Sequence, residues 1–518
     1  MLMGRASSSP SPSPSPSRKR AGVRGGSRPS SPMWSILPHP SLRATLSRWE
    51  RGCLCALALL TLTACSVGDA YVRPETKPPS AWKNAAPMAK AEWPSADWWR
   101  RFGSSRLDDL MGQARAGNFD IAVAMAKVRQ ADAQVAIMGA PLLPSLSASA
   151  GGTRQRSSLS SSVSSSSSSS KVVKAVYSNS FNSLLNASYE LDFWGKNAAG
   201  LDSAEAAAQA SRFDQQTVML TAQSSVATTY FEILGLQERL RVARNNIANA
   251  ESVLRVYQDR FAAGTATSLD VAQQESVVAN QRATIAPLEQ QMRQDFNALA
   301  ILTGRMPEEL SLVPEALESL LVPSVAPGLP SDLLNRRPDV QSAEASLRAA
   351  NADIAVARAA WFPSISLTGQ GGFQSVDFAK MMTHSSLLWS VASSVTQTIF
   401  DGGKIAGNVE QKRARQDELA TTYRKSVASA FSDVENALIA VEKTGEEVEA
   451  QKVAEATARR AFEIAQSLMA GGTVDVTTVL NTQKTLFAAQ DALAQARLLQ
   501  LQANVGLYKA MGGGWSGS

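Results

Sequence analysis

Two stretches of 65 residues, 197–261 and 405–469, contain no proline. Each is predicted to form a single helix, which at about 1.5 Å per residue would be roughly 98 Å long. Such a helix exceeds the size of a globular domain and needs other helices beside it. Side chains suited to lateral packing recur every three to four positions in the first stretch, at Val218, Ala222, Val226, Thr229 and Ile233. We expect the helices to reverse at Gly264 and Gly472 and to return as shorter helices, 269–302 and 476–511.

These stretches belong to an internal duplication. Residues 196–304 match residues 404–512 at an offset of 208, and residues 118–144 match residues 337–363 at an offset of 219. The offsets differ because the first copy contains a serine tract, 157–170, that the second lacks. We expect this tract to be a solvent-exposed loop tip without chemistry. Each copy reads as helix, two strands, very long helix and helix, with first helices predicted at 107–138 and 333–360.

The strands, predicted at about 144–194 and 363–400, alternate in polarity. From Phe181 to Phe193 the odd positions are mostly apolar or aromatic and the even positions mostly polar. The second copy repeats the pattern, with apolar residues at Leu387, Trp389, Val391, Val395 and Ile399 and polar residues at Ser390, Ser394, Thr396 and Thr398. This period is typical of a membrane β-barrel, with one face in lipid and the other in water. A soluble sandwich is the alternative, disfavoured because so few strands are embedded in so much helix.

Four strands cannot close a membrane barrel, since the smallest have about eight. We therefore expect several chains to share one barrel, eight-stranded in a dimer or twelve-stranded in a trimer. A pathway for solutes favours the wider barrel.

The first 64 residues read as a leader. An apolar run at 53–62 follows Arg43, Arg48 and Arg51, and it ends at Leu62-Thr63-Ala64-Cys65, which resembles the lipid-attachment site of bacterial lipoproteins. We expect acylation of Cys65. The alternative is ordinary cleavage that leaves a free thiol. Ser66 implies, by the same resemblance, sorting to the outer membrane. The Ser/Pro-rich segment 1–32 reads as an over-extended start, with Met33 as the initiator.

Composition argues against other functions. Nine of the 51 Lys and Arg residues lie in the leader with only one acid, Glu50, so the rest of the chain is nearly neutral despite a net charge of +6. The balance gives no support for nucleic-acid binding. All three cysteines lie at or before Cys65, and His384 is the only histidine beyond the leader. We therefore expect no metal, no cofactor other than the lipid, and no enzymatic activity.

The order of several short motifs resembles the TolC-like outer-membrane efflux proteins, in particular their lipoprotein branch that serves resistance-nodulation-division pumps. The resemblance covers about 440 residues. The motifs that carry it are Tyr71-Val72-Arg73-Pro74, Trp82, Asp97-Trp98-Trp99, Phe102, Leu107, Leu110, Pro287-Leu288-Glu289, Leu299–Gly304, Arg337-Pro338-Asp339-Val340 and Ala343-Glu344.

The resemblance implies a homotrimer with a twelve-stranded barrel in the outer membrane and a twelve-helix tunnel in the periplasm. It also implies that a periplasmic adaptor, working with an inner-membrane pump, docks at the helical tips. Here the tips carry Gly264, Leu269, Asp270, Val271, Gly472, Val479 and Leu480. A plain helical turn with packing side chains is the alternative for these residues, and both readings can hold together.

One feature departs from the family pattern. Members often place acidic residues early in the last helix, where they narrow the periplasmic mouth. Here that turn has the uncharged Thr477, Thr478 and Asn481, preceded by Asp475. We expect a polar constriction at these residues, with Asp475 supplying the charge.

The sequence thus predicts a mainly helical protein with a membrane β-barrel portion that passively conducts small solutes outward. An envelope lipoprotein with a periplasmic coiled coil and no pore is the main alternative, and a hydrolase and a periplasmic adaptor are weaker ones. The predicted boundaries are a leader at 1–64, a lipidated extension at 65–106, repeats at 107–304 and 331–512 joined by a linker at 305–330, and a tail at 513–518.

Overall fold

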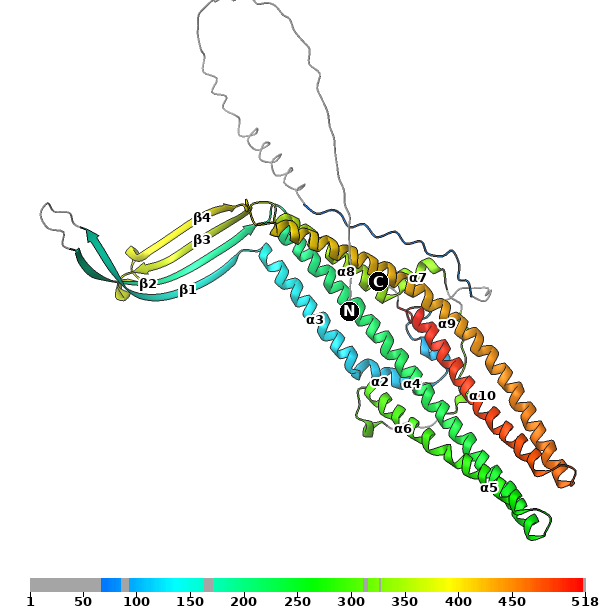
Figure 1. Ribbon diagram of the computed structural model, residues 1–518. Helices are drawn as coiled ribbons and strands as arrows, with labels where there is room; N and C mark the ends of the chain where they lie inside the picture. Colours follow the sequence, from blue (N-terminus) through cyan, green and yellow to red (C-terminus); the bar gives the residue numbers. More distant parts are fainter. Residues whose placement is uncertain (1–66, 85–92, 163–170, 311–314, 326–327, 516–518) are drawn as a thin grey trace, which may run out of the picture. The chain divides into compact units, whose positions relative to one another are not determined.

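The computed structural model describes residues 67–84, 93–162, 171–310, 315–325 and 328–515, with the backbone alone at 158–162 and 171–176 (Figure 1). The chain divides into two units, Met1–Thr61 and Leu62–Ser518, and every described residue lies in the second. The predicted leader and Cys65 lie outside the described residues.

Each repeat contributes helices and one pair of strands to this unit. The principal elements of the first repeat are α2 (Ser105–Gly117), α3 (Phe119–Gly139), β1 (Ser145–Ser162), β2 (Lys171–Leu191), α4 (Lys196–Ala262), α5 (Ser268–Ala283) and α6 (Ile285–Leu302). Those of the second are α7 (Pro330–Arg336), α8 (Pro338–Ala359), β3 (Ser364–Ser375), β4 (Leu387–Thr396), α9 (Lys404–Ala470) and α10 (Val476–Ala510). Short 3₁₀ helices include η2 (Trp98–Phe102), η3 (Ala140–Leu142), η4 (Pro307–Glu309), η5 (Leu317–Ser319), η6 (Phe378–Lys380) and η7 (His384–Ser386).

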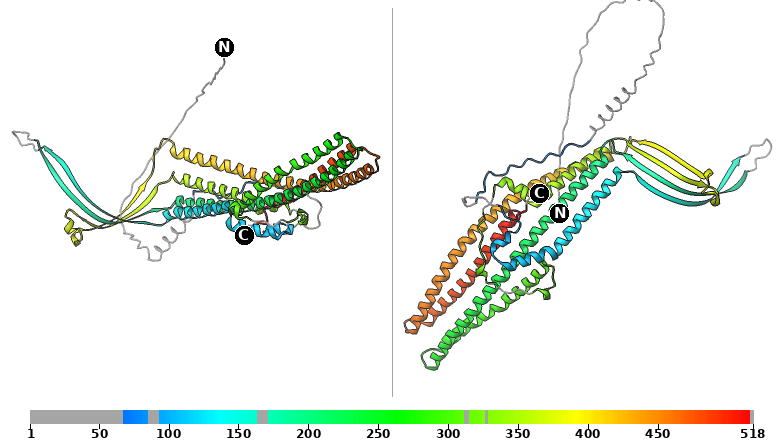
Figure 2. Two further views of the ribbon diagram at one scale, coloured as in Figure 1. Left: turned by 90° about the horizontal axis from the view of Figure 1, so that it is seen from below. Right: turned by 180° about the vertical axis from the view of Figure 1, so that it is seen from behind.

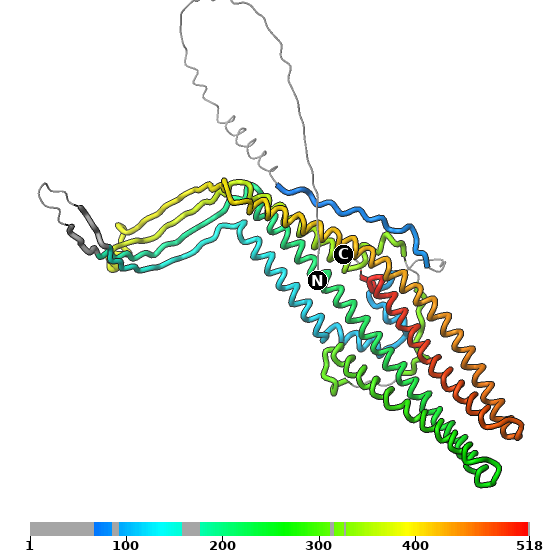
Figure 3. Tube along the Cα trace, viewed as in Figure 1, coloured from blue at the N-terminus to red at the C-terminus, as the bar shows by residue number. Residues whose placement is uncertain are grey.

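The strands form one antiparallel sheet in the order β1-β2-β3-β4, continuing from one end of the helices (Figure 3). The β1–β2 hairpin is the longer one, because β3 ends opposite Phe181 while β1 and β2 pair on to Ser162 and Lys171. The prediction that the whole serine tract is a loop tip is therefore wrong for residues 157–162, which pair with 171–176. Backbone hydrogen bonds to β2 hold these serines in a ladder despite their polar composition.

The long helix α4 packs against different partners along its length. It contacts α3 and α8 toward the sheet and α5, α6 and α10 toward the opposite end (Figures 1 and 2). The second long helix, α9, packs against α8 and α10. Two helical hairpins result, α4 with α5–α6 and α9 with α10. Each hairpin reverses at a glycine in the left-handed conformation, Gly264 (φ +73°) or Gly472 (φ +71°).

Three apolar clusters hold these helices together. The first joins the η2 aromatics to α4 and α10, with Trp98 stacked on Tyr508 at 5.1 Å between ring centroids. The second packs α7, α8, α9 and the end of α10 around Tyr423. The third lies between the two hairpins near their tips and includes Val253, Phe462 and Phe487. Burial of these side chains supplies the main stabilisation of helices that could not persist alone.

The helix before each strand pair is broken, where the sequence predicted one continuous helix. In the first copy Asn118 is extended, and its side chain accepts a hydrogen bond from the Ile121 amide at 3.0 Å as the cap of α3. In the second copy the break lies at Arg337, because Pro338 disfavours helical geometry at the preceding residue. The return helix of the first copy is broken as well, between Ala283 and Ile285. The ring of Pro287 would clash with the carbonyl of Ala283, four residues earlier.

In each repeat, a glycine at the end of the last helix packs against the backbone near the start of the same repeat. A Cβ built on Gly304 would lie 2.0 Å from the Gly117 carbonyl oxygen, and one on Gly512 would lie 2.0 Å from the Arg336 carbonyl oxygen. Both glycines have positive φ, at +73° and +86°. The same contact at equivalent positions of the two copies shows that the duplication extends to packing detail. Among the described helices, none has the length and apolar composition needed to cross a bilayer.

We predict that Gly512→Ala lowers the thermal unfolding midpoint of the purified protein. The added methyl group collides with the Arg336 backbone and its φ is unfavourable for alanine, which together cost on the order of 1–3 kcal/mol or more. Circular dichroism at 222 nm would measure the shift. Gly407→Ala, in α9 with open space around it, is the matched control and should not destabilise. Equal midpoints for the two variants would contradict this account of Gly512.

Candidate functional site

The register of the sheet gathers polar side chains on one face. Positions that pair across the strands share a face, so the alternation seen within single strands adds up across all four. One row, Ser147, Asn186, Gln370 and Ser390, runs from one edge of the sheet to the other. Further polar residues on this face are Ser145, Ser149, Asn182, Ser188, Glu190, Ser366, Thr368, Gln374, Ser394 and Thr396. Such a face is suited to water.

The opposite face is apolar and uncovered in the single chain. Its rows include Ala148, Leu185, Gly371 and Trp389, and Leu146, Ala187, Gly369 and Val391. Trp389 and Val391 are each 77% exposed. A contiguous exposed apolar face of this kind marks contact with lipid or another apolar surface.

Aromatic side chains lie at both ends of the apolar face. At the helical end they include Phe193, Trp361, Phe362 and Trp194, whose indole nitrogen donates to the Pro363 carbonyl at 2.8 Å. At the far end Phe181 meets Phe378 edge-on at 5.5 Å between centroids. Phe181 and Phe193 are twelve residues apart in β2 and its continuation. That spacing is about 40 Å along a strand, or roughly 30 Å at the usual tilt of barrel strands. The band between the aromatics thus matches the apolar thickness of a membrane.

The sheet is open at both edges. In the part of the chain that the structure describes, β1 and β4 each pair with one neighbour only. Their outer edges leave backbone groups that would remain without partners in lipid.

The helical tips divide into exposed and packed residues. Gly264 and Leu269 are exposed, and Asp270 closes a capping box with Thr267, accepting from its amide at 2.8 Å. Val271 packs against the cluster between the hairpins. In the second tip Gly472 is exposed, Leu480 is half-buried, and Val479 is fully buried among the same cluster. Val479 therefore packs the hairpin and is not on the surface of the single chain.

The predicted constriction residues lie together at the start of α10. Asp475 is its N-cap, accepting hydrogen bonds from the Thr478 hydroxyl at 2.6 Å and the Thr478 amide at 3.0 Å. These two bonds lower the pKa of the Asp475 carboxyl, which remains a charged acceptor at neutral pH. Thr477 and Asn481 are exposed. The cap explains why an acid occurs here, and it leaves one carboxylate oxygen of Asp475 without a described hydrogen-bond partner.

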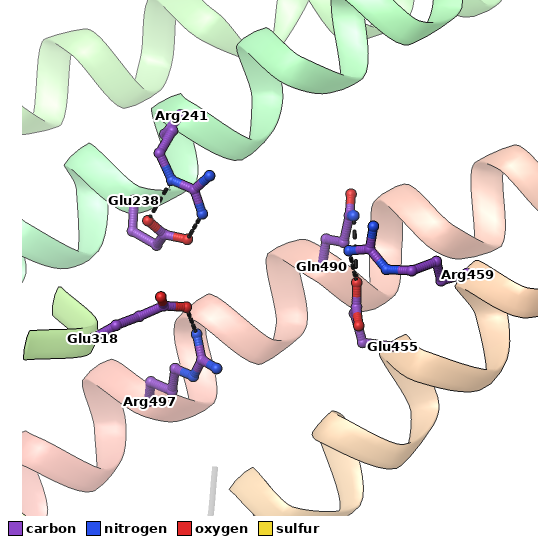
Figure 4. Close-up of polar contacts among 7 residues, drawn as sticks. All are labelled: Glu238, Arg241, Glu318, Glu455, Arg459, Gln490 and Arg497. Carbon is purple, nitrogen blue, oxygen red and sulfur yellow. Dashed lines mark hydrogen bonds and ion pairs between the residues drawn. The ribbon is translucent and has the colours of Figure 1, made fainter. Parts of the chain in front are cut away.

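An open cleft between α4, α9, α10 and η5 contains a group of charged residues (Figure 4). Three acids in it pair with three arginines, Glu238 with Arg241, Glu318 with Arg497, and Glu455 with Arg459. Because each carboxylate already has a cationic partner, the cleft is electrically balanced. This arrangement stabilises the helices and offers no free carboxylate pair for acid–base chemistry.

Polar contacts between the two hairpins were not predicted from the sequence. Arg239 in α4 donates to both carboxylate oxygens of Asp491 in α10, at 2.7 and 3.1 Å. Nearer the tips the fully buried Gln274 donates to the Ala250 carbonyl at 2.9 Å and faces the equally buried Gln483. Glutamines at core-facing positions of otherwise apolar helix faces were the available signal. Among the described residues, no cluster of His, Cys, Asp or Glu could hold a metal ion.

Curated relatives match most of the chain. The pyoverdine export outer membrane protein OpmQ of Pseudomonas aeruginosa is 41% identical over 461 residues, 88% of this chain and 96% of that protein. The toluene efflux pump outer membrane protein TtgF of Pseudomonas putida is 31% identical over 471 residues, 88% of this chain and 95% of that protein.

Solved structures share the fold. The outer-membrane channel OprN superposes with a TM-score of 0.80 at 26% identity, covering 87% of this chain and 100% of OprN. The open state of the MtrE outer membrane channel of Neisseria gonorrhoeae gives a TM-score of 0.76 at 28% identity, covering 87% of this chain and 98% of MtrE. The family of outer membrane efflux proteins matches residues 110–305 and 329–513, one match to each copy of the duplication. With the two-faced sheet, the paired helical hairpins and these similarities together, the chain belongs to the outer membrane efflux protein family.

Proposed function

We propose that three copies of this chain close a twelve-stranded barrel, with the apolar face in lipid and the polar face around the pore. The open edges of the sheet carry this proposal. In a ring, β1 of each copy would pair with β4 of the next, so that no backbone group is left unpaired in the bilayer. The helical hairpins of the three copies would continue the pore as a tunnel of twelve helices in the periplasm.

The chain is an outer-membrane channel component of an efflux system. A pore with polar walls conducts without an energy source, so we assign the driving force to an inner-membrane pump of the resistance-nodulation-division type. The relatives are named for different exported compounds, pyoverdine and toluene among them, although all match nearly the whole length of this chain. We therefore assign cargo selection to the pump and a general small-solute path to this chain.

A periplasmic adaptor protein would dock at the helical tips. Gly264 and Gly472 form the reversals, and Leu269 presents a large apolar side chain to solvent there. Leu269 lies in the capped first turn of α5, and burial of its side chain against a partner would stabilise the complex. The lipid proposed on Cys65 would anchor the extension at 65–106 in the outer membrane. An envelope lipoprotein without a pore would have no need of the uncovered apolar face of the sheet.

We predict opposite outcomes for arginine at two adjacent positions of β4. Trp389→Arg places a charge on the lipid face, which costs roughly 2–4 kcal/mol near the middle of a bilayer, and should reduce the amount of assembled protein in outer-membrane fractions. Ser390→Arg places the same charge on the pore face and should assemble normally while altering single-channel conductance. Heat-modifiable migration and planar-bilayer recordings would measure both. Equal tolerance of the two arginines, or a wild-type protein that stays monomeric in detergent without conductance, would contradict the barrel.

We predict that Leu269→Glu abolishes drug efflux by cells but leaves conductance of the purified channel intact, because only adaptor docking is lost. Drug accumulation in a deletion strain carrying each variant would measure the effect. Ile301→Glu is the control, since Ile301 is similarly exposed but lies at the opposite end of the return helices. Normal drug efflux in cells with the Leu269→Glu variant would show that Leu269 is not part of the docking surface.

We predict that Asp475→Asn reduces the cation preference of the channel. Asparagine is as good an N-cap as aspartate, so the substitution removes the charge while preserving the start of α10. Reversal potentials in a salt gradient at neutral pH, where the depressed pKa keeps Asp475 ionised, would measure selectivity. Asp475→Ala, which also loses the cap, separates the effect of charge from that of folding. Unchanged selectivity in the asparagine variant would show that Asp475 does not face the ion path.

A further inference from the structure

The apolar face of β1 becomes basic beyond the aromatic residues Phe181 and Phe378. Even positions of β1 lie on the apolar face as far as Gly152, which pairs with Phe181. The next two positions on the same face are Arg154 and Arg156, which pair with Asn179 and Tyr177. Both arginines are exposed. The band that is apolar in the middle of the sheet thus becomes basic at the end away from the helices.

The charge in this region has one sign. From Ser145 to Phe181 the sequence contains four basic residues, Arg154, Arg156, Lys171 and Lys174, and no acid. Among the described residues neither arginine has a carboxylate within ion-pair distance, and Asp377 in the neighbouring β3–β4 loop lies within 4.0 Å of Lys380 instead. Two arginines without a carboxylate partner among the described residues are suited to bind anions from outside the chain.

The two guanidinium groups are held side by side. Each lies 5.8 Å from the ring centroid of Tyr177, a cation–π contact. Such a contact orients a guanidinium and leaves its N–H groups free to donate. Residues two apart on one strand face are separated by about 7 Å, which lets two guanidinium groups donate to one phosphate or to two adjacent phosphates.

We propose that Arg154 and Arg156 form a binding site for the phosphate groups of lipopolysaccharide in the outer leaflet. The inference rests on the proposed barrel, which directs this end of the sheet to the cell exterior and this face to lipid. The phosphates of the lipid A headgroup lie just beyond the acyl chains, as the arginines lie just beyond the Phe181–Phe378 pair. Arginine is suited to this anion because its planar fork donates two parallel hydrogen bonds.

Binding of purified lipid A to the full-length assembled protein in detergent tests the proposal. Native mass spectrometry would compare bisphosphorylated lipid A with the same lipid after phosphate removal. We expect the wild type to bind the bisphosphorylated form at least tenfold more tightly, and the double variant Arg154→Gln/Arg156→Gln to lose that preference. Arg154→Lys/Arg156→Lys should retain part of it, because the charge stays but the bidentate donors are lost. Inorganic phosphate at millimolar concentration should not displace the lipid, and displacement by it would overturn a lipid-specific site.

The matched control is Arg413→Gln/Arg415→Gln, a second pair of exposed arginines two residues apart. These lie on α9 within ion-pair reach of Glu410 and Glu418, so their loss should leave lipid binding unchanged. Conductance of every variant in planar bilayers reports assembly separately. If the wild type conducts but the Arg154/Arg156 glutamine variant keeps its preference for phosphorylated lipid, the lipid site is refuted and the channel stands. If the wild type neither assembles nor conducts, the proposed function itself fails.

Discussion

A bilayer cannot hydrogen-bond the backbone groups along the outer edges of β1 and β4. In the described part of the chain these edges have no strand partner, and the sheet between them is apolar on one face and polar on the other. In a membrane these edges would need strand partners, which the proposed ring of copies would supply. In the proposed barrel, closure by neighbouring copies places the polar face around the pore and aligns the helices that continue from the strands.

The long helices also need packing partners, and the internal duplication supplies them. Neither α4 nor α9 could persist alone in water at a length of roughly 100 Å, so each is covered along its length by shorter helices. The duplication provides these partners twice and closes each copy at the same point, where Gly304 meets Gly117 and Gly512 meets Arg336. Contacts between the copies, such as Arg239 with Asp491, then join the two hairpins into one unit.

Periodic patterns in the sequence predicted the long helices and the two-faced strands, because both depend on side-chain spacing that a single chain reveals. The break at Asn118 was missed, although Gly117 and Asn118 are a local signal for a helix end followed by an N-cap. The break before Pro287 could have been predicted from the sequence. Proline has no backbone N–H to donate, and its ring clashes with the carbonyl group four residues earlier in a helix. The serines at 157–162 join a strand only because a partner strand lies opposite them. At the tips, spacing identified the turn but could not distinguish the buried Val479 from the exposed Leu269.

The two hairpins of one chain are similar but not identical. The first returns as α5 and α6 with an interruption near Thr284, and the second returns as the uninterrupted α10. In a threefold assembly the periplasmic end would therefore present six hairpin tips. These tips would be of two kinds in alternation and would not be equivalent. A partner ring that recognises one kind would have threefold stoichiometry. A partner ring of six identical subunits would have to bind two chemically distinct kinds of hairpin tip in alternation.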